Sequence, residues 1–318
     1  MRKMLIVGGA GYIGGVLTDI FMNNPDYDIT VYDNLLYELR YLKNIKFIYG
    51  DIRDRKTLGK IINDYDTVIW LAAIVGDGAC AVKDSLTEEI NFSSVKWFVD
   101  TYTSGKIIFM STCSVYGTNS EFVDEDSKTN PLSSYAETKL RAEKYVMKNA
   151  KDYLIFRLGT LYGLGDEHTR LRFDLVVNIF VLRAVMGEGL TVFGGQQWRP
   201  ILHVRDVANA IEFAIDNDIS GLYNLSEQNV EISTLAQEIK NFLPLTAIVF
   251  QDMQYEDLRD YKVSDAKIRS KGWSPKLSLN AGIEEMIKVF EENRVSDIYN
   301  AVYYNVDHIN KLSKKGKI

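Results

Sequence analysis

Tyr135 and Lys139 are the residues whose types and spacing most directly suggest catalysis. Positions four apart share one face of a helix, so the phenol and the ammonium would lie together. A tyrosine phenol has a pKa of about 10 and is a weak base at neutral pH, but a nearby positive charge favours the phenolate. Such a phenolate can accept the proton of an alcohol. The same spacing also occurs by chance, as a surface tyrosine beside a lysine.

Thr112 is a second candidate for the same chemistry. It belongs to the motif S-T-C-S at 111–114, which directly follows K-I-I-F-M at 106–110, a pattern typical of a strand. A hydroxyl offers one donor and two acceptor sites, so it can hold a substrate oxygen in line with a base. We therefore expect Thr112 at a strand end, close to Tyr135, with the catalytic helix packed beside it.

A glycine-rich turn near the start of the chain would place a second ligand beside these residues. Apolar runs at 4–7 and 29–32 predict two strands, and G-G-A-G-Y-I-G at 8–14 opens a helix between them. Glycine turns alone also occur in simple hairpins and helix caps. A turn between a strand and a helix is, however, the arrangement in which free N–H groups face a phosphate.

The individual residues of this motif have separate expected roles. Gly8 would permit a tight turn, Gly11 would let the backbone approach a pyrophosphate, and Gly14 would let the helix pack close to the sheet. Asp33 follows Gly14 by 19 residues. A carboxylate there can accept hydrogen bonds from a ribose 2′-hydroxyl and would repel a 2′-phosphate, which favours NAD over NADP.

Strand and helix patterns alternate from residue 4 to about 160, which predicts an α/β fold with a Rossmann-type, doubly wound parallel sheet. We expect a smaller C-terminal α/β substrate lobe after it. The suggested division is 1–165 for the NAD-binding domain, including the Tyr-x-x-x-Lys helix, and 166–318 for the substrate lobe, which is interleaved with it and which the resemblance described below assigns to a nucleotide sugar. Further strands are expected at 46–49, 67–71, 106–110, 190–193, 200–204 and 222–225, and further helices at 57–62, 171–185 and 235–243.

Residues after two of these strands would face the dinucleotide. Asp51 and Ile52 follow 46–49; the family resemblance described below implies an adenine contact for them, although Asp51 could instead cap the helix at 57–62. L-A-A at 71–73 ends another strand with small residues, which leave room for a cofactor that crosses the sheet edge. The next loop, 74–80, is a candidate substrate loop.

Composition narrows the function classes. The chain has 318 residues, 46% of them hydrophobic and 25% charged, which is typical of a globular enzyme with one large or two modest domains. A net charge of −6 argues against a nucleic-acid binder. No apolar run approaches the roughly 20 residues of a membrane span, and no signal peptide is expected. The two cysteines, Cys80 and Cys113, form no metal-type cluster and suit a reducing cytoplasm.

With these motifs in place, the chain resembles the extended short-chain dehydrogenase/reductases that act on nucleotide sugars. The motifs that carry the resemblance are G-G-A-G-Y-I-G at 8–14, Asp33, L-A-A at 71–73, S-T-C-S-V-Y-G at 111–117 and Y-A-E-T-K at 135–139. It implies NAD as cofactor and Tyr135 as base, assisted by Thr112 and Lys139. The positive nicotinamide of NAD⁺ would add to the charge that favours the phenolate.

The resemblance also implies two sets of binding residues and no metal. The implied cofactor site consists of Gly8, Gly11, Tyr12, Ile13, Gly14, Asp33, Asn34, Asp51, Ile52, Leu71, Ala72, Ala73, Asn91, Ser111, Tyr135, Lys139 and Leu161. The implied substrate site consists of Val75, Gly76, Asp77, Thr112, Cys113, Ser114, Thr160, Asn178, Arg199 and Arg259. Thr160 stands where the family usually has Asn. Arg259 could bind a phosphate or form a surface ion pair with Asp257.

The residues after Thr112 separate the possible reactions. In related 4,6-dehydratases an Asp–Glu pair follows this threonine, and in related decarboxylases a Glu lies close by. Cys113 and Ser114 are poor acid–base groups, so the sequence favours oxidation at C4 without loss of water. The motifs do not separate a 4-dehydrogenase from a 4-epimerase, which uses the same keto intermediate. A non-catalytic dinucleotide sensor is a third class, but such proteins typically lose the tyrosine or the lysine.

Two further expectations concern the substrate and the assembly. The segment A-A-I-V-G-D-G-A-C at 72–80 resembles dehydrogenases of capsular heptose assembly, which oxidise GDP-D-glycero-α-D-manno-heptose at C4, so a GDP-sugar is favoured over UDP- or TDP-sugars. A homodimer or tetramer is expected, because in the family the helix after Asn91 and the Tyr135 helix pair with their copies. The apolar residues that suggest this here are Trp97, Phe98, Tyr102, Leu140, Tyr145 and Val146, although they could simply pack on the sheet. The three histidines, His168, His203 and His308, are expected to be structural or exposed.

Overall fold

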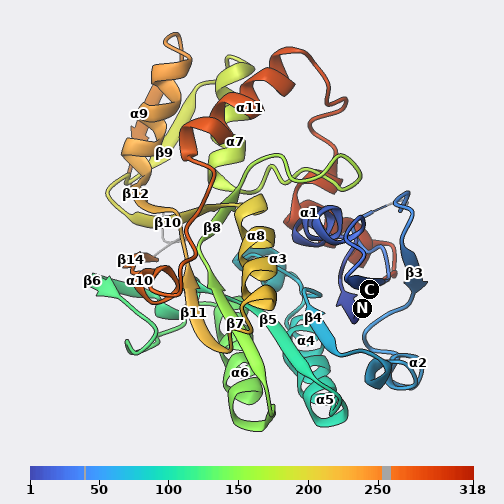
Figure 1. Ribbon diagram of the computed structural model, residues 1–318. Coiled ribbons are helices and arrows are strands. Elements are labelled where there is room, and N and C mark those ends of the chain that lie inside the picture. Colours follow the sequence, from blue (N-terminus) through green and yellow to red (C-terminus); the bar gives the residue numbers. More distant parts are fainter. Residues whose placement is uncertain (39–40, 253–258) are drawn as a thin grey trace.

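A seven-stranded parallel sheet forms the centre of the computed structural model, which describes residues 1–38, 41–252 and 259–318 (Figure 1). Its strand order is β11-β7-β5-β4-β1-β2-β3. The chain starts at β1 and adds strands outward in both directions, so the predicted α/β class with a doubly wound Rossmann-type sheet is confirmed. The strands are β1 (Arg2–Val7), β2 (Tyr27–Asp33), β3 (Lys46–Tyr49), β4 (Thr67–Trp70), β5 (Lys106–Thr112), β7 (Tyr153–Leu158) and β11 (Gly221–Leu225).

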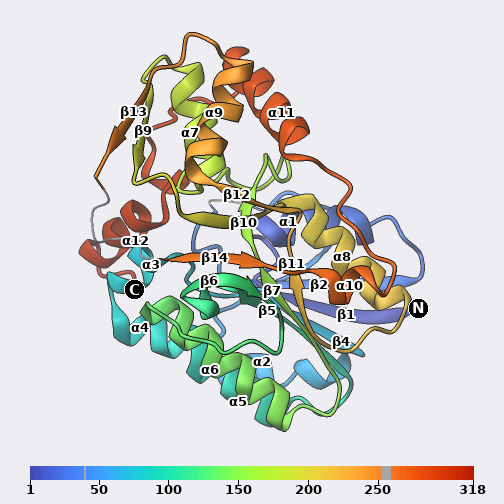
Figure 2. The same cartoon turned by 90° about the vertical axis from the view of Figure 1, so that its left-hand side faces the viewer.

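The central strands are apolar on both faces because helices cover both faces. In β1, Ile6 packs with helices α1 (Tyr12–Phe21) and α8 (Val204–Asp216), whereas Leu5 and Val7 point to the other face. On that face they belong to the apolar core beneath α5 (Ser94–Thr101) and α6 (Ser134–Asn149) (Figure 2). Helix α6, which carries Tyr135 and Lys139, is thus packed against the strands that end at the site.

The second lobe stands above the carboxyl edge of the sheet in both views (Figures 1 and 2). Its core is formed by three helices that pack around small sheets. The helices are α7 (Val176–Val185), α9 (Ile232–Phe242) and α11 (Leu279–Glu291). The sheets of the lobe pair β12 (Gln228–Glu231), β10 (Trp198–His203) and β8 (Thr160–Tyr162), then β13 (Ile248–Gln251) with β9 (Leu190–Phe193). A further sheet, β14 (Asp260–Val263) with β6 (Thr118–Val123), packs in a separate apolar cluster that includes Cys113 and Leu140.

The remaining elements are short. They are α2 (Arg55–Gly59), α3 (Asp77–Ala81), α4 (Asp84–Glu88), α10 (Ala266–Arg269), α12 (Asn305–Lys314), a π turn η2 (Glu89–Ser93) and the 3-10 turns η1 (Ile62–Asp64), η3 (Cys113–Tyr116) and η4 (Ala301–Tyr303). Helix α12 returns from the second lobe and packs beside α3, near the mouth of the site (Figure 2). Strand β11 comes from the second half of the chain but joins the first sheet, so the two parts are interleaved there.

Three predicted helices have different bounds. The helix expected at 171–185 begins at Val176, because residues 170–174 form an irregular segment from which Arg170, Arg172 and Asp174 line the site. Helix α9 begins three residues earlier than expected, at Ile232. The helix expected at 57–62 is replaced by α2 and the separate turn η1. The cap of α2 is Asp54, whose Oδ1 accepts from Thr57 N at 3.1 Å, so Asp51 does not cap it.

The apolar residues that suggested a dimer lie mostly inside the chain. Phe98, Tyr102, Leu140 and Val146 are all buried, whereas Trp97 and Tyr145 are half-buried. The oligomeric state therefore stays a prediction, to be measured by light scattering. Within the part of the chain that the structure describes, no helix has the length and apolarity of a membrane span, and no group of three or more His, Cys, Asp or Glu is arranged to hold a metal.

Candidate active site

A cavity of about 1320 Å³ opens at the carboxyl edge of the central sheet. Strand ends contribute Gly8 after β1, Asp33 from β2, Ala72 after β4 and Thr112 from β5. This is the edge at which open α/β sheets bind ligands. The cavity continues into the second lobe, so it can hold two ligands end to end. Its lining there includes Phe180, Arg183, Thr191, Phe193, Gln197 and Ile232.

The glycine turn forms one wall of the cavity. Gly8 has a φ of +82°, and a Cβ at this residue would lie 2.5 Å from Ala72 N, so both conformation and space require glycine. A Cβ at Gly11 would meet only Gly8 O, at 3.4 Å. Because Gly11 lines the cavity and protein packing does not require its small size, that size leaves room for a ligand. This is the cradle that the resemblance predicted for a pyrophosphate.

Gly14 has a different role from the one expected. A Cβ at Gly14 would lie 2.5 Å from Gly9 Cα, so this glycine lets the helix pack on the turn itself. Gly9 is the residue that packs closely against the sheet, because a Cβ there would lie 3.0 Å from the side chains of Ile6 and Val31. The expectation for Gly14 was therefore wrong in detail, although a side chain at either position would disrupt the turn.

Asp33 connects the glycine turn to the end of β2. Its Oδ2 accepts from Ala10 N at 3.0 Å, and its Oδ1 accepts from Leu35 N at 2.7 Å. Desolvation raises the pKa of this carboxyl, while the backbone hydrogen bonds oppose the shift. Asp33 lines the cavity next to the turn, and its oxygens are fixed in place, so the residues present fit the ribose and diphosphate of a dinucleotide.

Asp51 and Ile52 also line the cavity, beyond Asp33. Asn34 Nδ2 donates to Asp51 Oδ2 at 2.9 Å, and Arg53 pairs with the same carboxylate through two nitrogens at 2.9 Å each. Burial alone would raise the pKa of Asp51, but the Arg53 hydrogen bonds outweigh it and lower the pKa to about 2. The carboxylate is thus a fixed acceptor at the expected adenine end.

Helix α6 places the catalytic pair. Ser133 caps the helix, since its Oγ accepts from Ala136 N at 3.2 Å, and Tyr135 and Lys139 then face the cavity from successive turns. Thr112 reaches the same place from the end of β5, and its Oγ1 accepts from Ser114 N at 3.1 Å. The structure therefore brings together the three residues expected to be catalytic.

The ionisation of the pair differs from the expectation. Enclosure in the cavity raises the pKa of Tyr135, the Cys80 thiol adds to the rise, and a hydrogen bond with Thr112 opposes it. Burial lowers the pKa of Lys139 to about 7. In residues 1–38, 41–252 and 259–318, no carboxylate or hydrogen bond holds the ammonium, which lies 4.1 Å from the centre of the Phe109 ring. The protein alone therefore does not favour the phenolate.

A buried ion pair supports this corner from behind. Glu143 lies one turn after Lys139, and its Oε1 accepts from Arg157 Nη2 at 2.6 Å. Its Oε2 accepts from Ser111 Oγ at 2.7 Å, next to Thr112. Sequence reasoning did not identify Glu143, although its spacing from Tyr135 and Lys139 repeats the same helical interval. The pair joins α6 to the ends of β5 and β7.

Two residues expected at the site lie behind its wall. Asn91 does not line the cavity: its Oδ1 accepts from Ile74 N and its Nδ2 donates to Ile74 O, both at 2.9 Å. It supports the loop and leaves no group for a cofactor. Cys113 is fully buried, with Sγ 3.3 Å from Arg157 O, because the first residue of the turn η3 points into the core. Ser114 faces the cavity instead.

Asn178 is the third correction. Its Oδ1 accepts from Gly163 N at 3.0 Å, and its Nδ2 donates to Arg172 O at 2.9 Å. The amide is thus engaged by the backbone of the segment before α7 and lies outside the cavity lining. Asn178 shapes this segment and does not face a substrate. All other predicted cofactor and substrate residues line the cavity, Thr160 and Leu161 included, and their roles stay predictions.

Two arginines meet in the middle of the cavity, where the second lobe begins. Arg259 Nη1 lies 3.2 Å from Asp77 Oδ2 and 3.2 Å from Ser114 Oγ. Arg199 Nη1 donates to the backbone oxygen of Arg259 at 2.5 Å, and both residues line the cavity. Asp257, the alternative partner of Arg259, lies outside the described residues. The two guanidinium groups are suitably placed for the diphosphate of a nucleotide sugar.

Sequence reasoning missed a set of cavity residues from three segments of the second half. They are Arg170, Arg172, Asp174, Phe180, Arg183, Phe193, Gln197, Asn305 and Val306. The only signal was the charged run R-L-R-F-D at 170–174, in a segment expected to be an amphipathic helix. Three charges so close together on a helix that must bury an apolar face conflict with that expectation.

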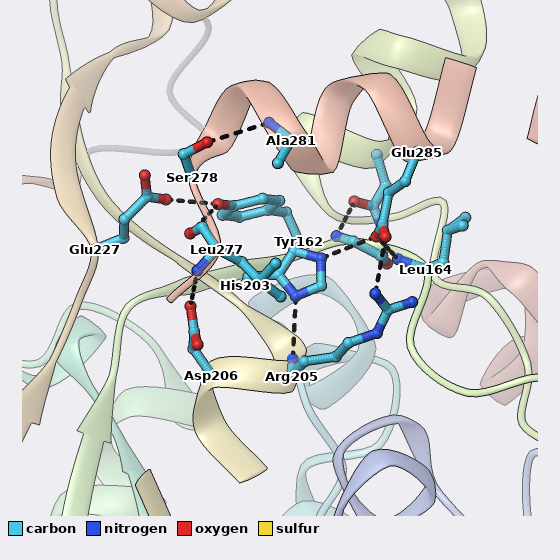
Figure 3. Close-up of polar contacts among 12 residues, drawn as sticks. Tyr162, Leu164, His203, Arg205, Asp206, Glu227, Leu277, Ser278, Ala281 and Glu285 are labelled. Atoms are coloured by element: carbon cyan, nitrogen blue, oxygen red, sulfur yellow. Dashed lines mark hydrogen bonds and ion pairs between the residues drawn. The ribbon is translucent and has the colours of Figure 1, made fainter. Parts of the chain in front are cut away.

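The histidines do not reach the cavity. His203 is fully buried behind it, where Nδ1 accepts from Arg205 N at 3.2 Å and Nε2 donates to Glu285 Oε1 at 2.9 Å (Figure 3). It caps α8 and belongs to a polar network that joins α8 to α11. His308 Nε2 donates to Leu36 O at 2.8 Å. No histidine lines the cavity in the described ranges of the chain.

Comparisons with known proteins identify the relatives of this arrangement. The NAD dependent epimerase/dehydratase family is matched over residues 4–226. A putative UDP-glucose 4-epimerase of Methanocaldococcus jannaschii is 29% identical over 307 residues, which cover 91% of this chain and 99% of the relative. A UDP-N-acetyl-α-D-glucosaminuronate decarboxylase of Bacillus cytotoxicus is 27% identical, covering 92% of this chain and 98% of the relative. The crystal structure of UDP-glucose 4-epimerase from Thermotoga maritima superimposes with a TM-score of 0.79 at 24% identity, over 92% of this chain and all of that one.

Proposed function

Since the chain belongs to the NAD dependent epimerase/dehydratase family, we propose that it oxidises the C4 hydroxyl of a nucleotide-activated sugar, with Tyr135 as the base. The observation that carries this proposal is the meeting of Thr112, Tyr135 and Lys139 in one cavity. That cavity extends from the dinucleotide cradle to the arginines of the second lobe. A nucleotide sugar can therefore lie with its sugar at Tyr135 and its diphosphate at Arg199 and Arg259.

The residues divide the work of oxidation. Tyr135 accepts the hydroxyl proton, and Thr112, held by Ser114 N, orients the same oxygen. When bound, NAD⁺ would supply the hydride acceptor and a further positive charge that favours the phenolate of Tyr135. Lys139 has no hydrogen-bond partner among the described side chains, so its ammonium is available to the hydroxyls of the cofactor's ribose.

The geometry does not favour loss of water. An elimination at C5 and C6 requires both a base and a protonated acid beside the sugar. Two carboxyls of the cavity lining are held by arginines: Asp77 Oδ2 lies 3.2 Å from Arg259 Nη1, and Asp174 accepts from Arg172 at 2.8 and 2.9 Å. Burial alone would raise the pKa of Asp174, but Arg172 lowers it, so this group stays ionised and is a poor acid. Cys113, the residue after Thr112, faces the core.

A 4-epimerase is the second candidate, favoured by the M. jannaschii relative, whose description is a putative UDP-glucose 4-epimerase. It requires the same three residues, and it also requires the keto sugar to rotate before hydride returns. A non-catalytic dinucleotide sensor is a remote alternative, because all three catalytic residues line the cavity.

A GDP-heptose is the first substrate to test within this proposal. The support is the resemblance of 72–80 to dehydrogenases of capsular heptose assembly, together with the position of Val75, Gly76 and Asp77 in the cavity lining. UDP- and TDP-sugars form the comparison set, because the relatives named above are described with UDP-sugars.

Mass spectrometry decides among these reactions. The cofactor of the purified protein is identified first, and a panel of GDP-, UDP- and TDP-sugars is then incubated with it and an oxidant that recycles NADH. A product lighter by two hydrogens indicates a dehydrogenase, and an isomer of unchanged mass indicates an epimerase. A product lighter by one water would contradict the assignment, and the absence of any turnover across a broad panel would favour the sensor.

A further inference from the structure

The segment between β8 and α7 lies directly over the glycine turn. We call residues 163–174 the cover loop. Tyr12 OH donates to Gly163 O at 2.5 Å, and a Cβ at Gly165 would lie 3.0 Å from the Tyr12 ring. A Cβ at Gly15, at the start of α1, would lie 2.5 Å from Asp166 Oδ2. The cover loop is thus in contact with the N-terminal turn of the helix that faces the dinucleotide.

The cover loop is fastened at several points. Lys43 Nζ lies 2.7 Å from Asp166 Oδ2 and donates to Gly15 O at 2.6 Å, so one buried ammonium joins the loop to α1. Glu285 Oε1 accepts from Leu164 N at 3.2 Å and belongs to the polar network of α8 and α11 (Figure 3). Asn178 forms hydrogen bonds with Gly163 and Arg172, which lie near the two ends of the loop. These contacts hold the loop in one position against the turn.

Arg172 projects from this loop into the cavity. It is 9% exposed, and its Nε and Nη2 donate to Asp174 at 2.8 and 2.9 Å. Burial alone would lower the pKa of Arg172, but Asp174 raises it, so the guanidinium stays charged. Its Nη1 makes no hydrogen bond within 1–38, 41–252 and 259–318. Arg172 lines the same cavity as Gly8, Gly11 and Tyr135, so its guanidinium shares one space with the glycine turn and the catalytic tyrosine.

The glycine turn itself has no cation. Residues 8–21 contain no Lys or Arg, and α1 offers only backbone N–H groups and its dipole to a diphosphate. We propose that Arg172 binds the diphosphate of the dinucleotide from the side opposite the turn, with Asp174 holding the guanidinium in orientation. A guanidinium with free N–H groups, fixed in a buried site, is well suited to phosphate oxygens. The inference rests on NAD as cofactor and is independent of the sugar chemistry proposed above.

Helix α12 braces this arrangement. Arg170 Nη1 donates to Val302 O at 2.6 Å, and Arg170 Nη2 donates to Asn305 Oδ1 at the start of α12. Asn305 Nδ2 in turn donates to Val75 O at 2.8 Å, across the cavity mouth. Asn305 N lies 3.4 Å from Asp174 Oδ2, so the same residue contacts the carboxylate that orients Arg172. Asn305 is therefore a positioning residue for the proposed contact.

The test measures binding of NAD, ADP-ribose and adenosine to cofactor-free protein by calorimetry, with no sugar present. Arg172→Met should weaken NAD and ADP-ribose about 10- to 100-fold, the usual effect of removing a hydrogen bond to a charged group, and leave adenosine unchanged. It should also reduce the dependence of NAD affinity on salt. Asn305→Ala should weaken NAD by a smaller factor. Arg183→Met, which removes a cavity arginine in the second lobe, is the matched control and should leave NAD affinity unchanged.

If Arg172→Met does not fold because Asp174 is left unpaired, the double variant Arg172→Met/Asp174→Asn removes both charges and serves instead. Unchanged affinity for NAD and ADP-ribose in a folded Arg172 variant would overturn the proposal. Equal weakening of adenosine and ADP-ribose would also overturn it, because the effect would then lie outside the diphosphate. A failure of the C4 assignment leaves these measurements interpretable, since none of them uses a sugar.

Discussion

Two buried cations line the cavity from opposite regions, and their surroundings differ. Lys139 comes from α6 in the Rossmann part, has no carboxylate partner among the described residues, and has a pKa lowered to about 7 by burial. Arg172 comes from the cover loop and is paired with Asp174, which keeps its pKa above the ordinary value although burial opposes this. Both side chains are at least nine-tenths buried. The opposite directions of their pKa shifts therefore come from the presence or absence of a carboxylate partner, because the degree of burial is similar.

The difference separates a group that takes part in chemistry from a group that binds. A lysine without a partner can change its charge when a cofactor or substrate arrives, so its proton is sensitive to the reaction. An arginine paired with a carboxylate keeps both its charge and its orientation, which suits recognition of a permanent anion. The catalytic corner obtains its rigidity separately, from the Glu143–Arg157 pair behind it.

The largest effect is expected from Tyr135→Phe, which tests whether the α6 corner performs the chemistry. The change removes only the hydroxyl that accepts the proton, so turnover should fall by about 10² to 10⁴, the usual contribution of a general base. NAD affinity should stay close to that of the unchanged protein, since the cradle and the cover loop are intact. NADH formation under single-turnover conditions measures the effect. Turnover near the original rate would remove Tyr135 from the mechanism.

A direct test of the comparison exchanges each cation for methionine. Lys139→Met should make the cofactor-free protein more stable, because it removes a buried amine that has no partner, while turnover falls at least about tenfold. Arg172→Met should make it less stable by about 3 kcal/mol, because Asp174 is left buried without its partner. Urea unfolding of both variants provides the measurement. If both variants became more stable, or both less stable, the contrast between an unpaired Lys139 and a paired Arg172 would be contradicted.

The pH dependence of stability tests the lowered pKa of Lys139 independently of the size of the stability change. The pKa of Lys139 is about 7 in the folded chain and about 10.5 when unfolded, so between these values the unfolded chain binds the proton more tightly. As pH falls from about 10.5 toward 7, the unchanged protein should therefore lose stability relative to Lys139→Met, and the difference should level off below pH 7. A difference that does not vary with pH would contradict the lowered pKa.

Asp33→Ala should have a smaller effect, on cofactor choice. It removes the acceptor at the adenosine ribose, so NAD should bind about tenfold more weakly, in line with the loss of a hydrogen bond to a charged group, and discrimination against NADP should relax. Titration of both cofactors measures the ratio. Asn34→Ala is a neighbouring control that leaves the carboxylate in place. Equal affinity for NAD and NADP in the unchanged protein would already oppose this role.

The smallest effect on binding is expected from Asn91→Ala, which distinguishes support of the wall from contact with the cofactor. Ile74 N and Ile74 O lose their partners, so the free energy of unfolding should fall by about 1–3 kcal/mol. NAD affinity should change less than about threefold, because Asn91 does not line the cavity. A large loss of NAD affinity without a loss of stability would restore Asn91 to the cofactor site.

The sequence by itself determined the parts of the site that lie within one contiguous element. The glycine turn with Asp33, the Tyr135–Lys139 pair and the doubly wound sheet were predicted because strand, turn and helix geometry relates residues at fixed, short spacings. Parallel strands end at a common edge, so the order of the motifs was enough to bring Thr112 to Tyr135. These features needed no knowledge of how distant segments pack.

Only the tertiary structure decided which side chains face the cavity at irregular backbone. In the turn η3, Cys113 points into the core and Ser114 into the site, and no periodicity relates the two. Asn178 turns to the backbone of the cover loop, and Arg172 enters the cavity from a segment whose pattern suggested a helix. Such directions are set by contacts between residues far apart in the chain, as between Asn305 and Val75, because an irregular segment has no repeating hydrogen bonds to fix its side chains.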